Sequence, residues 1–548
     1  MATAVRHQPI ASFQTHPSQY RHWKLRIEGA IARLVMDVKE ENGLRPDDYE
    51  LKQNSYDLGV DIELCDAIER LRFEHPEVRA LVFESALPKV FCAGANIRML
   101  ASSTHGFKVN FCRYTNETRL SLEDASANSG LRSICAANGT AAGGGYELAL
   151  AADSIYLVDD GNAAVSLPEV PLLGVLPGTG GLTRLVDKRK VRRDLADLFC
   201  TKAEGFRARD AVKYKLVDGS FPRSRWDAGI NEIAAKTAAA SPARASKGVT
   251  LSVVPSEVVG RVRKYRSVEL ALDAEGRVAT LTVRGPDAPA PKDLVAEGAE
   301  TWSMRVFREI DDALLHLRFN HDTVGLVLVR TEGDAAAVLA HDEAIQGDTW
   351  FAREIRLLQA RVLRRLDNTA KSIFALIDRG SCFAGTLFEL ALAADRSYML
   401  SDDDDSPTVQ PTRIASGGAY PMGTGLSRIA ARFARTPDKA EEILNLAEGI
   451  SSEDALEHGL VTLAPDAIDW DDEIRIAIEE RISLSPDALT GMEQNLRFVG
   501  TEGCDTKIFG RLSAWQNWIF QRPNAVGEEG ALTLYGHPTR PRFDFRRT

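Results

Sequence analysis

The sequence predicts an α/β protein built from two tandem copies of one strand-and-helix unit. Apolar runs of strand length alternate with longer segments of helical spacing, which is the pattern of α/β folds. Two distant stretches, "SICAANGTAAGGGYELALAADSIYLVDD" (133–160) and "SIFALIDRGSCFAGTLFELALAADRSYMLSDD" (372–403), follow one order and share "ELALAAD". Further along, the stretches 177–185 and 421–429 also resemble each other. We interpret this as an internal duplication.

Three segments are expected along the chain. Residues 1–20 are polar and predict a flexible arm, 21–260 form the first copy, and 261–548 form the second copy with C-terminal helices and a tail. A chain of 548 residues is long enough for about two to four domains. The small and polar stretch 236–250 is the expected connection or the edge of an outer helix.

Each expected element follows from its local pattern. Residues 23–38 predict two strands around a Glu-Gly turn, and residues 61–74 have the apolar spacing of a helix. Buried strands are expected at 78–85, 131–139 and 153–160, with a strand, turn and helix at 89–100. In the second copy, we expect opening strands at 262–284, a helix at 302–320 and a buried strand at 323–333.

The composition is that of a globular protein from a reducing compartment, and the chain is long enough to be an enzyme. The fractions of hydrophobic and charged residues, 44% and 26%, are typical of soluble globular proteins. A formal net charge of −11 argues against nonspecific binding to nucleic acid or to an acidic membrane. The seven cysteines are scattered without a C-x-x-C pair, and the N-terminus has no apolar core. We therefore expect a cytoplasmic protein without disulfides or a membrane span.

One carboxylate stands where it is costly to bury. In "AAGGGYELALAAD" (141–153), Glu147 follows three glycines and precedes five apolar residues, so its helix has no polar face before Asp153. Glycines at a helix start can point free N–H groups at an anion. A second small-residue turn, 92–95, also opens a helix, and a second carboxylate, Glu169, lies in a loop after a strand.

These features together predict an oxyanion hole beside two acid–base carboxylates. Each feature alone is more typical of a plain structural element: a flexible glycine turn, a solvated glutamate or a proline-rich surface loop. Their order along the chain favours the functional interpretation.

Three blocks, "FCAGANIRML", "GTAAGGGYELALAAD" and "LPEVPLLGVLPGTGGLTRL", together resemble the crotonase (enoyl-CoA hydratase/isomerase) superfamily in order and spacing. The resemblance implies tandem ββα-spiral units and an acyl-CoA thioester as the substrate. It implies that the backbone N–H groups of Ala95 and Gly144 hold the thioester oxygen, and that Glu147 and Glu169 are the catalytic pair. It implies no metal or redox cofactor, because coenzyme A is part of the substrate and the thioester accepts the charge.

The resemblance also implies which residues meet the substrate. These are Ala93, Gly94, Asn96, Ile97 and Arg98 of the first turn and Gly143 beside the hole, with Cys112 in the region that covers the acyl pocket. Asn96 stands where the family usually has Asp. A buried, inert thiol is the commoner case for such a cysteine, and a place in the pocket is the alternative for Cys112.

The second copy departs from the family pattern. His341 and Asp342 stand at the positions of Gly94 and Ala95, and Thr386 replaces Gly144. Glu389 matches Glu147, but no carboxylate matches Glu169. We therefore expect a degenerate copy that is retained for structure or assembly.

Two glutamates allow water addition, water elimination or hydrolytic carbon–carbon cleavage. The overall pattern, including the stretch 515–548, resembles carbon–carbon lyases of this family that open an aromatic ring. The alternatives are a hydratase or isomerase for another acyl-CoA and a silent acyl-CoA-binding protein. We expect a homodimer that binds neither nucleic acid nor membrane.

Overall fold

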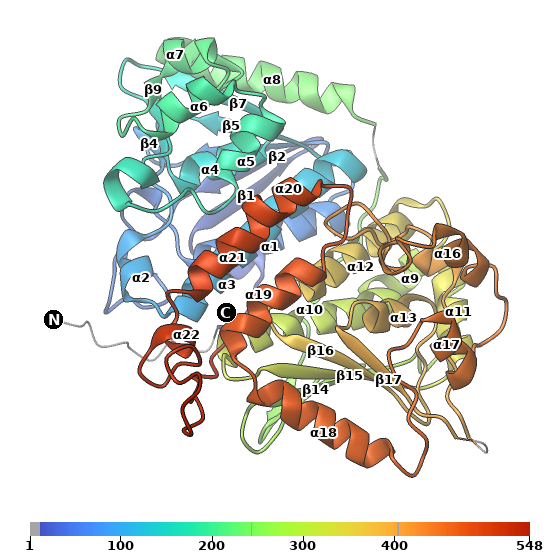
Figure 1. Cartoon of the computed structure of the whole chain (residues 1–548). Helices are drawn as coiled ribbons and strands as arrows, with labels where there is room; N and C mark the ends of the chain where they lie inside the picture. The colour runs from blue at the N-terminus through green and yellow to red at the C-terminus, as the bar shows by residue number, and fades with distance from the viewer. Residues whose placement is uncertain (1–10, 243, 403–404) are drawn as a thin grey trace. The chain divides into compact units, whose positions relative to one another are not determined.

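The protein consists of two compact units, which meet in the sequence between Val253 and Val254. The structure is a computed structural model that describes residues 11–242, 244–402 and 405–548 (Figure 1). The sequence predicts the boundary between residues 260 and 261. The structure assigns the stretch just before it to the second unit, because strand β11 (Glu257–Val259) pairs with β12 (Val262–Lys264) of the second sheet.

The first unit is built on a six-stranded sheet in the order β1-β2-β3-β5-β7-β10. Its strands are β1 (Trp23–Glu28), β2 (Ile31–Met36), β3 (Ala80–Ser85), β5 (Arg132–Ala137), β7 (Ser154–Asp159) and β10 (Gly219–Pro222). The predicted hairpin is confirmed: β1 and β2 pair in antiparallel fashion around Gly29, whose φ is +64°. The other strands pair in parallel, so they read as short apolar runs bounded by helices.

A smaller four-stranded sheet carries the segments that the sequence analysis singled out. Its order is β4 (Val90–Cys92), β6 (Thr140–Ala142), β8 (Ala164–Ser166) and β9 (Phe206–Arg207). The helices of this unit are η1 (Pro17–Gln19), η2 (Lys52–Asn54), α1 (Leu58–Phe73), α2 (Ile97–Ser102), α3 (His105–Asn128), α4 (Gly144–Ala151), η3 (Glu169–Leu173), α5 (Gly181–Thr183), η4 (Arg184–Lys188), α6 (Arg193–Cys200), α7 (Ala208–Lys213), η5 (Arg223–Arg225) and α8 (Trp226–Ala240).

The predicted flexible arm is wrong for residues 11–20; residues 1–10 lie outside the described residues. Phe13 is buried, and its ring lies 5.6 Å from that of Tyr114. The Tyr20 hydroxyl donates to Asp66 at 2.5 Å. The few apolar side chains of this polar stretch are therefore fixed by tertiary contacts.

The second unit repeats the strand order of the first. Its seven strands are β11, β12, β13 (Val268–Leu272), β14 (Val278–Arg284), β15 (Leu326–Glu332), β16 (Ser372–Ile377) and β17 (Arg396–Met399). β13 and β14 pair in antiparallel fashion as β1 and β2 do, and β14 to β17 pair in parallel as β2, β3, β5 and β7 do. This match agrees with the internal duplication.

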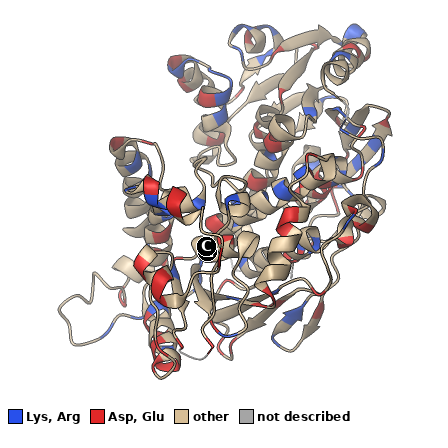
Figure 2. Cartoon of the chain, turned by 90° about the vertical axis from the view of Figure 1, so that its right-hand side faces the viewer, with Lys and Arg blue, Asp and Glu red and all other residues tan. Residues whose placement is uncertain are grey.

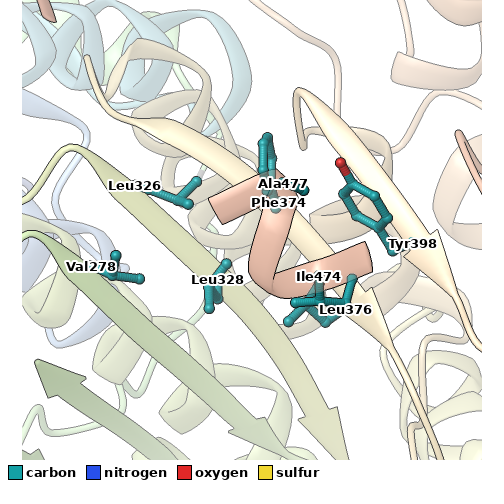
Figure 3. Packing of buried hydrophobic residues seen from close by; sticks show 8 residues of the cluster. All are labelled: Val278, Leu326, Leu328, Phe374, Leu376, Tyr398, Ile474 and Ala477. Carbon is teal, nitrogen blue, oxygen red and sulfur yellow. The ribbon is translucent and has the colours of Figure 1, made fainter. Parts of the chain in front are cut away.

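One face of this second sheet packs against α18 (Trp470–Ser483), as Figure 3 shows. The cluster consists of Val278, Leu326, Leu328, Phe374, Leu376 and Tyr398 from the strands, with Ile474 and Ala477 from the helix. The other helices of this unit are α9 (Leu294–Glu297), η6 (Gly298–Glu300), α10 (Trp302–Asn320), α11 (Ala335–Ala344), α12 (Trp350–Asn368), α13 (Gly385–Leu392), α14 (Arg413–Ser416), α15 (Arg428–Arg432), α16 (Pro437–Ile443), α17 (Ser452–His458), α19 (Pro486–Leu496), α20 (Cys504–Lys507), η7 (Ile508–Leu512), α21 (Ser513–Ile519) and α22 (Pro523–Val526).

Charged residues of both signs are interspersed along the helices (Figure 2). Within the described residues, no helix combines the length and the apolar character that crossing a bilayer requires.

The C-terminal tail is anchored by a buried arginine, which gives a testable stability prediction. Arg547 donates to Glu493 at 2.6 Å and to the Gly325 carbonyl at 2.9 Å. Arg547→Ala removes one of three arginines around this buried carboxylate, beside Arg481 and Arg497, so we expect it to lower the free energy of unfolding by about 1–3 kcal/mol. The neighbouring Arg546→Ala breaks an exposed pair with Asp544 and should cost about 0–1 kcal/mol. Urea unfolding of the two variants checks this, and equal midpoints would contradict it.

Candidate active site

Two backbone N–H groups lie unpaired beyond neighbouring parallel strands. Ala95 follows β4, and Gly144 follows β6. Tyr56 donates its N–H to the Gly94 carbonyl at 3.0 Å and accepts from Asn96 N–H at 2.8 Å, which leaves the amide between them free. Neither Ala95 N–H nor Gly144 N–H has an acceptor among the described residues. This pair has the composition of an oxyanion hole.

A glycine permits the close approach of the two strand ends. Gly94 has a φ of +91°, and a Cβ on it would lie only 2.8 Å from the Gly144 nitrogen and 2.9 Å from the Ala142 carbonyl oxygen. Gly143, just before helix α4, has a φ of +53°. The glycines of both turns are therefore required by backbone conformation and by space.

Glu147 is buried on α4, and a distant loop supplies its hydrogen bonds. The carboxylate accepts from Thr179 N at 2.9 Å, from Gly181 N at 2.8 Å and from the Thr179 hydroxyl. These three donors offset the cost of burying the charge. They explain how an apolar helix can carry a carboxylate.

Glu169 lies at the start of η3 with an incompletely satisfied carboxyl group. Its Oε2 is buried without a hydrogen-bond partner among the described residues. Its Oε1 would lie 2.7 Å from a Cβ placed on Gly143. Burial, together with the nearby charge of Glu147, raises the pKa of Glu169 to about 7. Near neutral pH this group can therefore both donate and accept a proton.

The raised pKa predicts how Glu169 affects stability with pH. The unfolded chain releases this proton near pH 4.5, whereas the folded chain holds it to about pH 7. The stabilising effect of the proton is thus complete below pH 4.5 and is lost as pH rises to 7. The Tm of Glu169→Gln minus that of the wild type should therefore rise over this window. A difference that stays as constant as that of the exposed control Glu232→Gln would contradict it.

Helix α3 holds the loop around Glu147 and was not predicted from the sequence. Asn116 donates to the Gly178 carbonyl at 3.1 Å, and Arg184 donates to the Thr179 carbonyl at 3.0 Å. Glu123 binds the Arg184 guanidinium through two hydrogen bonds of 2.9 Å. The signal available in the sequence was a helical spacing of side chains that can interact, namely Cys112, Asn116, Arg119 and Glu123.

Arg119, on the same face of α3, was also missed. It is buried and donates to the Gly144 carbonyl at 3.0 Å and to the Tyr56 hydroxyl at 3.1 Å. It therefore contacts residues from both sides of the amide pair.

Cys112 lies near the loop that surrounds Glu147. Its sulfur is 4.0 Å from the position of a Cβ on Gly178. Burial and the charge of Glu147 raise the pKa of the Cys112 thiol to about 11, so it stays protonated near neutral pH. Its contact with substrate remains a prediction.

The residues expected to meet coenzyme A are divided between structural and accessible positions. Asn96 caps α2, accepting from Met99 N at 2.9 Å and donating to the Glu50 carbonyl at 2.7 Å. Its side chain is thus occupied by the fold. Ala93, Ile97 and Arg98 are exposed on the same turn and are accessible to a ligand.

In the second unit, the amide that corresponds to Gly144 N–H is already occupied. Thr386 N donates to Asp342 Oδ2 at 2.7 Å, and the Thr386 hydroxyl donates to Oδ1 of the same carboxyl at 2.5 Å. Asp342 lies within helix α11, so residues 338–343 do not form the strand-and-turn of the first unit. Glu389 is buried and bound by Ser416 at 2.6 Å and by Arg428 at 3.2 Å.

A family model and a relative of full length both match this chain. Residues 49–257 match the family model "Enoyl-CoA hydratase/isomerase". The chain is 53% identical over 560 aligned positions to a benzoyl-CoA-dihydrodiol lyase of Aromatoleum evansii, with 99% of this chain and 100% of that protein covered. The chain therefore belongs to the enoyl-CoA hydratase/isomerase (crotonase) family.

Two further matches cover less of this chain. A fatty acid oxidation complex subunit alpha of Shewanella loihica is 32% identical over 36% of this chain and 26% of its own length. A solved enoyl-CoA hydratase structure from Geobacillus kaustophilus is 32% identical over 40% of this chain and 75% of its own length, with a TM-score of 0.35.

Proposed function

We propose that this chain is a ring-opening lyase of aerobic benzoate degradation. It converts 2,3-epoxybenzoyl-CoA and two molecules of water to 3,4-dehydroadipyl-CoA semialdehyde and formate. Seven acyl carbons become a six-carbon thioester and one-carbon formate, so the equation balances without an oxidant. The observation that carries the proposal is the 53% identity to a benzoyl-CoA-dihydrodiol lyase over the full length of both chains.

The two free amides are assigned to the thioester. Ala95 N–H and Gly144 N–H bind the carbonyl oxygen and stabilise the negative charge that develops on it when the ring is attacked. One such donor contributes about 3–4 kcal/mol of transition-state stabilisation. The thioester is the electron sink, and the proposed reaction uses coenzyme A only as part of the substrate.

Glu147 and Glu169 divide the proton transfers. Glu147, whose side chain accepts three hydrogen bonds, is assigned as the group that activates water. Glu169, with its pKa raised to about 7, donates to the opened epoxide oxygen. The ring carbon that carries the new hydroxyl groups is then expelled as formate.

The exposed residues of the turn 93–98, which are Ala93, Ile97 and Arg98, are assigned to the coenzyme A portion, and Cys112 is assigned to the wall of the acyl pocket. The second unit is assigned a structural role, because Asp342 occupies the amide of Thr386. One thioester is therefore bound per chain.

We also infer a cytoplasmic homodimer. Among the described residues no disulfide joins any of the seven cysteines, which suits a reducing compartment. Large apolar side chains are exposed near the C-terminus, among them Phe509, Leu512 and Phe520, and a second copy would cover them. Light scattering of the purified protein measures the dimer directly.

The decisive assay supplies the purified protein with 2,3-epoxybenzoyl-CoA and, separately, with crotonyl-CoA. We expect formate and a new acyl-CoA from the first substrate. Hydration of crotonyl-CoA without formate from the epoxide would instead identify an ordinary enoyl-CoA hydratase. Binding of both thioesters without any turnover would identify a silent acyl-CoA-binding protein.

A further inference from the structure

Helix α3 buries an arginine without an ionic partner directly behind the two free amides. Arg119 is 1% exposed, and its three acceptors are neutral oxygens: the carbonyls of Gly144 and Thr115 and the hydroxyl of Tyr56. It forms no ion pair with any described residue, and its Nε has no hydrogen-bond partner among them. Arginine is rarely buried to this extent unless it is paired. Packing alone therefore does not account for it.

The contacts of Arg119 connect the two halves of the oxyanion hole. One Nη atom donates both to the carbonyl of Gly144, whose N–H is free, and to the hydroxyl of Tyr56. The backbone of Tyr56 in turn bonds Gly94 and Asn96, on either side of Ala95. A single guanidinium thus fixes the residues that set the separation of the two amides.

The guanidinium also brings a positive charge close to the site. In a dry environment such a charge is poorly screened and favours negative charge developing on a bound oxygen. The carboxyls that act on it from neighbouring elements are Asp61 and Glu147. Asp61 accepts from the Thr115 hydroxyl, and Glu147 is bound by the loop of Thr179. Each therefore has hydrogen-bond donors of its own.

The second unit provides an internal comparison. Gln359 precedes Ser372, the first residue of β16, by the same number of residues as Arg119 precedes Arg132, the first residue of β5. Gln359 accepts from the Tyr420 hydroxyl at 2.7 Å, and that hydroxyl lies 3.2 Å from the Thr386 hydroxyl. The amide of this unit is occupied by Asp342, and the corresponding helix position is neutral. The buried arginine thus occurs in the first unit, where the Gly144 N–H has no acceptor among the described residues.

We propose that Arg119 is a positioning residue that fixes the amides of Ala95 and Gly144 and supplies positive charge behind them, so that a bound thioester carbonyl is polarised. This inference rests on the proposed function, because it assumes that a thioester oxygen binds those amides. It assigns a role in the reaction to a residue that does not touch the substrate.

The test compares Arg119→Gln with Arg119→Lys. Glutamine is the residue of the second unit and removes the charge, whereas lysine keeps the charge but cannot reproduce the planar fork. The probe is benzoyl-CoA, which lacks the epoxide. Its thioester carbonyl band is recorded by infrared difference spectroscopy when bound, and kcat and KM are measured with 2,3-epoxybenzoyl-CoA. Thermal unfolding of each variant establishes that it is folded.

We expect the wild type to move the carbonyl band to lower frequency, and R119Q to lose most of that displacement. R119Q should lose about 100-fold in kcat with KM changed far less, as for a misplacement of reacting groups. R119K should retain more of the band displacement and more of kcat than R119Q does. A folded R119Q with the wild-type band and wild-type kcat overturns the proposal.

Three further outcomes complete the test and show which of the two claims fails. If R119Q does not fold, R119K and Tyr56→Phe replace it, and wild-type bands and kcat in both overturn the proposal. A band that depends on Arg119 in a protein that releases no formate supports the positioning role and overturns only the lyase assignment. A wild-type protein that leaves the band of bound benzoyl-CoA unchanged overturns both.

Discussion

Glu147→Gln is expected to keep the fold and to lower kcat for ring opening by about 10²–10⁴-fold, the usual contribution of a positioned acid–base group. Glutamine has nearly the same size and can still accept from Thr179 N and Gly181 N through its amide oxygen. It cannot take a proton from water. The loss should therefore appear in kcat rather than in the binding of benzoyl-CoA.

Glu389→Gln is the matched control for this variant. It makes the same substitution at the corresponding position of the second unit, where Glu389 pairs with Arg428. It should lower thermal stability, because it weakens a buried ion pair, and leave kcat unchanged. A wild-type kcat in Glu147→Gln, or equal losses of kcat in both variants, would contradict the assignment of the active site to the first unit.

The second large effect is expected from Gly94→Ala. The new methyl group would lie 2.8 Å from the Gly144 nitrogen and would require a φ of +91° from alanine. The strand ends must therefore separate, and the two amides no longer meet at one oxygen. Loss of one donor of an oxyanion hole lowers kcat by about 10²–10³-fold.

Gly130→Ala is the matched control, because it introduces backbone strain without the close contact that a Cβ at Gly94 would make. Gly130 also has a positive φ, +68°, but a Cβ there meets nothing within 4 Å. It should lower the Tm and leave kcat near the wild-type value. The measurement is kcat for formate release, together with the Tm, for both variants. Similar kcat values in the two alanine variants would show that the contact between Gly94 and Gly144 does not matter for the reaction.

Much of the fold was predictable because local pattern and tertiary structure agree. The helix expected at 302–320 is found as α10 (Trp302–Asn320), and the hairpin turns at Gly29 as expected. The glycine turn before Glu147 was predictable for the same reason, since three glycines before an apolar helix leave few alternatives. The order of strands in the second unit likewise follows from the repeat.

The rest depends on contacts between residues far apart in the sequence. Helix α3 is polar enough that its apolar spacing did not mark it, so Arg119 was not found. Residues 11–20 were predicted as an arm because only the contact with Tyr114 shows that Phe13 is buried. The Asp342 carboxylate closes the Thr386 amide from a helix where a turn was expected.

The most direct test of the central claim is the stoichiometry of the products. Formate and acyl-CoA products are quantified after complete conversion of 2,3-epoxybenzoyl-CoA by the wild type and by the double variant E147Q/E169Q. The account predicts one formate for each six-carbon semialdehyde thioester in the wild type, and no formate from a double variant that still binds benzoyl-CoA. Formate release by the double variant at the wild-type rate would contradict it.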